Sequence, residues 1–145
     1  MKPYLEPRFL GALLLKTRHA GTAQGQMENF KAPYFVTPLA AVQIEHLLSW
    51  GQQDAPMRPA CQEGKVEWDY WFAEGIFQIE SSDWDSAVRL ARAMMRRTHR
   101  VAESWLVYLH ATLAASSGAT HYLSFQPAYR AVAKTLSLKL LPERL

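Results

Sequence analysis

The chain has 145 residues, of which 49% are hydrophobic and 20% charged, and its formal net charge at pH 7 is +3. This length and balance fit one packed globular domain and exclude a disordered chain. Cys61 is the only cysteine, so no internal disulfide and no cysteine-based zinc site can form, and we expect a reducing, cytoplasmic location. The apolar run 9–15 is much shorter than a membrane span requires, so we expect no membrane association.

The first half of the chain predicts short strands alternating with helices. In chain order the elements are a strand ending at Tyr4-Leu5, helices over 9–15 and 19–30, a strand over 34–37, a helix over 39–50, an exposed loop over 51–65 and a helix over 66–74. The strand over 34–37 is predicted from its β-branched and aromatic residues. The loop over 51–65 is predicted from two prolines, two glycines and polar residues.

The second half continues this alternation. Its elements are a strand over 76–79, a helix from Asp83 to about Thr98, a helix over 103–117, a strand over 121–125, a helix over 128–136 and a strand over 138–141. Asp83 is a suitable N-cap, and Gly118 occupies a helix-stop position. Strands alternating with amphipathic helices predict an α/β fold, a three-layer α/β/α sandwich with a mainly parallel central sheet. Ligands of such folds bind beyond the carboxyl ends of the strands, which here are Leu5-Glu6, Val36-Thr37 and Phe125-Gln126.

Four segments follow one another in an informative order: "YLEPRFLGALLL", "FVTPLAAVQIEHLL", "DWDSAVRLARAMMRR" and "LVYLHATLAASSGATHYLSFQ". Together they resemble the PIN-domain family, in particular the toxin-type ribonucleases of toxin–antitoxin systems. The resemblance covers nearly the whole chain outside 51–65. It implies a single PIN-like domain over residues 1–145. It also implies a site where carboxylates bind Mg²⁺ or Mn²⁺ to activate the water that cuts RNA.

The resemblance places the four metal-binding acids of the family at Glu6, Gln43, Val107 and Gln126. Only Glu6 remains acidic, and magnesium in proteins is usually anchored by carboxylates. We therefore expect a degenerate member to which we assign no catalytic residue, no metal and no cofactor. Glu103, placed one helical turn before Val107, is a possible substitute acid.

Four side chains are candidate binding residues. Arg8 stands where the family has a small hydroxyl residue, and it either binds a phosphate or a partner's acidic side chain or pairs with Glu6. His110 matches a histidine of the family pattern and is either a structural imidazole or a base near the cleft. Arg92 and Arg96 share one helix face, which is either a phosphate-contacting stripe or a solvated surface.

These observations predict a PIN-like protein that binds RNA or a small antitoxin-like protein without cleaving RNA, and that forms a homodimer. Two alternatives stay open. One is a residual Mg²⁺- or Mn²⁺-dependent endoribonuclease that uses Glu6 and Glu103, and the other is a structural or regulatory dimer. Trp68, Trp71 and Phe72 fall at helical spacing and predict a core stripe that extends to a dimer edge.

Overall fold

The computed structural model describes residues 1–145, which form two compact units. The terminal unit comprises Met1–Glu6 and Ser81–Leu145, and the inner unit comprises Pro7–Glu80. Each unit combines helices with a small parallel sheet, so the predicted α/β class and parallel pairing are confirmed. The strands pair in two sheets, of three and two strands, and the three-layer sandwich around one central sheet stays a prediction.

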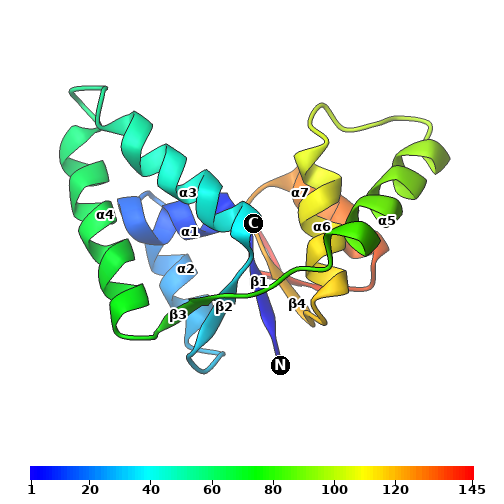
Figure 1. The fold of residues 1–145 in the computed structure, drawn as a ribbon, viewed down its shortest axis with the longest axis horizontal. Helices are drawn as coiled ribbons and strands as arrows, with labels where there is room; N and C mark the ends of the chain where they lie inside the picture. The colour runs from blue at the N-terminus through cyan, green and yellow to red at the C-terminus, as the bar shows by residue number, and fades with distance from the viewer. The chain divides into compact units, whose positions relative to one another are not determined.

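The terminal unit contains the sheet β1-β4-β5 and three helices (Figure 1). The strands are β1 (Pro3–Leu5), β4 (His121–Leu123) and β5 (Lys139–Leu141), and the helices are α5 (Trp84–Arg97), α6 (Leu106–Ser116) and α7 (Pro127–Thr135). The helix α5 starts where predicted, because the Asp83 carboxylate accepts a hydrogen bond from Ser86 N at 3.1 Å. The helix α6 ends before Gly118, whose φ of +75° is a conformation that glycine adopts without strain. α6 packs between α5 and α7 and is buried from Val107 to Ala114.

The inner unit contains the two-stranded parallel sheet β2-β3 and four helices. Its elements are α1 (Pro7–Leu15), α2 (Ala20–Met27), β2 (Tyr34–Val36), α3 (Pro38–Gly51), α4 (Arg58–Ala73) and β3 (Phe77–Ile79). α1 packs against the other three helices. Trp68 is buried, and the ring of Trp71 stacks on that of Phe77 at 4.8 Å, so this part of the aromatic stripe belongs to the core. No helix of either unit is both long and apolar enough to cross a membrane.

The predicted exposed loop over 51–65 is wrong in its second half. Helix α4 begins at Arg58, with Pro59 in its first turn, where the missing N–H of proline costs nothing. Gly64 allows close helix packing, since a Cβ there would lie 2.9 Å from Leu48 Cδ2. Cys61, which we expected in that loop, is fully buried in the same helix. Proline and glycine therefore act here as a helix start and a packing contact, not as loop residues.

Candidate functional site: the carboxyl edge of the β1-β4-β5 sheet

Polar side chains of the terminal unit gather where β1 and β4 end. Glu6 N donates to Leu123 O and Ser124 N donates to Leu141 O, each at 3.1 Å, so the parallel pairing continues one residue past the strands. The Glu6 carboxylate is 1% exposed, and its Oε2 accepts a hydrogen bond from Ser124 Oγ at 3.1 Å. The same hydroxyl accepts a hydrogen bond from Gln126 N at 3.0 Å. Ser124 thus links the first and fourth predicted acid positions.

Arg130, on α7, joins this edge and was not foreseen from the sequence. Its buried guanidinium donates from Nη1 to Ser124 O at 2.9 Å and from Nη2 to Pro142 O at 2.7 Å. Burial lowers the pKa of this guanidinium from its ordinary value. The available signal was its position four residues after Gln126, which places both on one side of the first helical turn. A cation therefore clamps the ends of β4 and β5 beside the single carboxylate.

Gln126 belongs to this edge, whereas Val107 of the same unit does not. Val107 is 3% exposed and belongs to an apolar cluster with Ala91 and Tyr108. Gln126 is the N-cap residue of α7, but its side chain makes no capping hydrogen bond. Gln43 lies on α3 of the inner unit and is partly buried. The terminal unit thus brings together Glu6 and Gln126 and builds Val107 into its core.

Glu103 is exposed and lies before α6, so the prediction that it shares a helical face with Val107 is wrong. The helix starts only at Leu106 because the preceding residues make other contacts. Ala102 N donates to Tyr108 Oη at 2.9 Å, and Leu106 N donates to Ser104 Oγ at 3.2 Å. These bonds hold the chain in a turn, and Glu103 lies in that turn.

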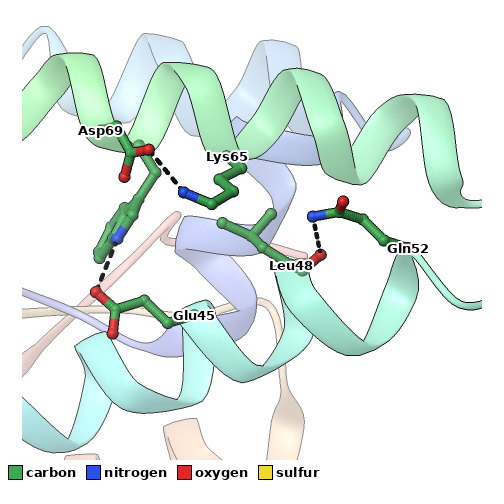
Figure 2. A network of polar contacts seen from close by, with 6 residues as sticks. Glu45, Leu48, Gln52, Lys65 and Asp69 are labelled. Atoms are coloured by element: carbon green, nitrogen blue, oxygen red, sulfur yellow. Dashed lines mark hydrogen bonds and ion pairs between the residues drawn. The ribbon is translucent and has the colours of Figure 1, made fainter.

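Two acids of the inner unit make polar contacts, one between α3 and α4 and one within α4 (Figure 2). Glu45 accepts a hydrogen bond from Trp68 Nε1 at 3.3 Å. Asp69 pairs with Lys65 at 2.8 Å, one turn apart on α4. Glu45 therefore joins two helices of this unit, which explains its presence without a catalytic role.

His110 lies in a buried aromatic cluster of the terminal unit. It is fully buried, and its Nδ1 is 2.6 Å from Tyr4 Oη. Burial lowers the pKa of His110 to about 3, so its imidazole is neutral at neutral pH. Tyr122 stacks on Tyr4, and its buried hydroxyl has no hydrogen-bond partner. Burial, followed by the nearby Tyr4 and Glu6, raises the pKa of Tyr122 well above its ordinary value. His110 is therefore a neutral imidazole in the buried interior of the terminal unit, bonded to Tyr4.

The three candidate arginines are exposed. Arg8 lies in the first turn of α1, and its predicted pairing with Glu6 stays a prediction. Arg92 and Arg96 lie on α5, one turn apart, while the opposite face of this helix buries Ala87 and Ala91. Both side chains therefore point to solvent from one face of α5.

A groove on the inner unit was not visible in the sequence. A cavity of about 650 Å³ lies among α1, α2 and α4, and a second one of about 250 Å³ shares Leu13, Gln24 and Trp71 with it. We call the two together the inner groove. Apolar side chains line it, among them Leu13, Val66 and Trp71, and its charged residues are Lys16, Glu28, Glu63 and Glu67. The groove forms where α4 packs beside α1 and α2, which lie more than 30 residues earlier in the chain. No local sequence pattern therefore predicts it.

Comparison of the chain with family models, with curated proteins and with solved structures gives no match. The PIN resemblance therefore depends on the sequence motifs and stays a prediction. The donor set at its four positions fits magnesium poorly. Mg²⁺ keeps several waters in protein sites, whereas Glu6 is almost inaccessible and already bonded to Ser124. The chain contains no group of three or more His, Cys, Asp or Glu side chains that could hold a metal ion.

Proposed function

We propose that the protein is a cytoplasmic PIN-like binding protein without metal-dependent nuclease activity, and that its inner groove binds an amphipathic helix of a small, antitoxin-like protein. The observation that carries the proposal is the groove itself, two adjoining cavities that share an apolar wall. The loss of cleavage is supported by the packing of Val107 among apolar residues and by the burial of Glu6. We further propose a three-layer sandwich and a homodimer, in keeping with the order of strands and helices.

The lining of the groove indicates the chemistry of its partner. Leu13 and Trp71 are half-buried, and Val66 is 71% exposed, so apolar surface is open to a ligand. An amphipathic helix would cover this surface with apolar residues at positions i, i+3, i+4 and i+7. Three glutamates against one lysine line the groove, which favours basic residues on the flanks of that helix.

A labelled Leu/Lys-rich amphipathic peptide of about four helical turns tests the groove by fluorescence anisotropy. Val66→Lys places a cation against the peptide's own lysines and should weaken binding about tenfold, which corresponds to about 1.4 kcal/mol. Val42→Lys is the matched control, because Val42 is also an exposed valine on a helix of the same unit but does not line the groove. If Val66→Lys and Val42→Lys weaken peptide binding equally, the inner groove is not the peptide-binding site.

Cleavage is tested separately. Purified protein is incubated with structured RNA, with and without Mn²⁺, and the products are resolved on a denaturing gel. We expect intact RNA in both samples. Manganese-dependent cleavage that disappears in Glu6→Gln would establish the residual endoribonuclease instead.

A further inference from the structure

We infer that the C-terminal half of α5 and the segment 98–105 form a binding site for single-stranded nucleic acid. Six exposed residues make up this site, which we call the basic strip: Arg92, Arg96, Arg97, His99, Arg100 and Trp105. All of them belong to the terminal unit. The inference is independent of the proposed function, because the inner groove belongs to the other unit.

The positive charge of the chain is concentrated around the strip. Residues 89–105 contain five arginines and one glutamate, a balance of +4. The whole chain carries +3, so all other residues together sum to −1. Such a confined excess favours a polyanionic ligand, since each phosphate contact releases counterions.

The arginines of the strip are not engaged elsewhere. The guanidinium groups of Arg92, Arg96, Arg97 and Arg100 form no ion pair or hydrogen bond within the chain. The neighbouring acids of α5, Asp83 and Asp85, lie at its other end, where they complement the helix N-terminus. The four cations are therefore available to a ligand along the last two turns of α5 and beyond it.

Trp105 adds a stacking surface at the far end of the strip. Its side chain is 60% exposed, and it immediately precedes α6. The segment that carries it leads from the end of α5 back to the start of α6 (Figure 1). Tyr108, whose hydroxyl receives the Ala102 N–H bond, packs in the α5–α6 core and fixes the base of this segment. An exposed indole next to a turn that is bonded to the α5–α6 core offers a surface on which unpaired bases stack.

Unpaired bases and a negative backbone together define the ligand. A duplex offers the arginines its phosphates but keeps its bases stacked on one another, so Trp105 would gain nothing from it. Single-stranded RNA and DNA both offer free bases, and only a contact to the 2′-hydroxyl would separate them.

Fluorescence anisotropy with a labelled single-stranded RNA of about a dozen nucleotides tests the site, alongside DNA of the same sequence and an RNA duplex. Trp105→Ala should weaken binding of the single strands about fivefold or more, and Trp105→Phe should restore most of it. Trp50→Ala is the matched control, because Trp50 is 57% exposed on α3 and lies outside the strip. The Trp50→Ala variant should bind the single strands with the affinity of the wild type.

The arginines are tested by the salt dependence of binding between about 50 and 200 mM. The triple substitution R96Q, R97Q, R100Q should lower the slope of log K against log salt by about 2, since each phosphate contact contributes about 0.7. The triple R18Q, K31Q, R144Q removes the same charge outside the strip and should leave the slope almost unchanged.

Each outcome decides the inference. Equal losses for Trp105→Ala and Trp50→Ala, equal losses for the two triples, or tighter binding of the duplex would overturn it. So would binding to anionic phospholipid vesicles with none to nucleic acid. The two proposals can fail independently. Val66→Lys should weaken peptide binding at the inner groove and leave RNA binding at the basic strip unchanged.

Discussion

Tyr4 and Tyr122 lie face to face in the terminal unit, with ring centroids 5.4 Å apart and planes inclined by 6°. Both side chains are buried, but their hydroxyls differ. Tyr4 Oη is 2.6 Å from His110 Nδ1, whereas Tyr122 Oη has no hydrogen-bond partner. The same substitution, tyrosine to phenylalanine, should therefore lower stability at Tyr4 and leave it level or raise it at Tyr122.

The size of each change in the free energy of unfolding depends on whether the removed hydroxyl had a hydrogen-bond partner. Tyr4→Phe removes the partner of a fully buried imidazole nitrogen, which should cost about 1–3 kcal/mol. Tyr122→Phe removes a buried hydroxyl whose desolvation is not offset by a hydrogen bond. Burying such a group costs about 1–3 kcal/mol, so the free energy of unfolding should stay level or rise by up to that amount.

Urea unfolding followed by circular dichroism measures both variants against the wild type. In thermal unfolding each kcal/mol should shift the midpoint by roughly 2–4 °C for a chain of this size. The double variant Tyr4→Phe, His110→Leu replaces both partners and should recover part of the loss. A loss above about 1 kcal/mol for Tyr122→Phe, or none for Tyr4→Phe, would refute this account of the cluster.

Three further predictions concern the same two units. Burial lowers the pKa of His110 to about 3 from 6.5, so between these pH values the unfolded chain binds more protons. Stability should fall as the pH drops through that window, by up to roughly 1.4 kcal/mol per pH unit, and His110→Gln should reduce this fall in urea unfolding at about pH 7 and about pH 5. Gly51→Ala should cost about 1–3 kcal/mol of stability, because the added Cβ would overlap the buried sulfur of Cys61. Gly25→Ala meets open space in α2 and should stabilise the protein by up to about 1 kcal/mol. Equal shifts of the thermal midpoint for the two variants would contradict this prediction. Aspartate at two of the family's acid positions should have different effects on thermal stability. Val107→Asp buries a carboxylate among apolar residues and should cost at least about 3 kcal/mol. Gln126→Asp should cap α7 and stabilise the protein by about 0.5–1 kcal/mol. A mild Val107→Asp variant would show that this position is open.

Local sequence signals predicted the elements whose causes are local. Asp83 caps α5 as expected, and the β-rich run near Tyr34 forms β2. The start of α6 was placed too early, because the bond from Ala102 N to Tyr108 Oη depends on how the turn packs. Gly64 was assigned to a loop because its packing against Leu48 of α3 leaves no local trace.

The candidate site shows the same division between local and long-range causes. Glu6 and Gln126 were predicted to lie near each other from the ends of parallel strands, and the structure places both at the carboxyl edge of one sheet. Ser124 and Arg130 were missed because their partners are far away in sequence. The hydroxyl of Ser124 bonds Glu6 across 118 positions, and Arg130 reaches the carbonyl that follows β5. Such contacts depend on the sheet having formed.

The two proposed binding surfaces carry opposite charges, and this makes them controls for each other. The basic strip has a balance of +4 over residues 89–105, whereas three glutamates and one lysine line the inner groove. A lysine-rich helix that suits the groove is repelled by the strip, and a nucleic acid that suits the strip is repelled by the groove. Added salt should therefore weaken the binding of both ligands. Only for the nucleic acid should the slope depend on the number of arginines in the strip, because condensed counterions are released from the phosphates alone.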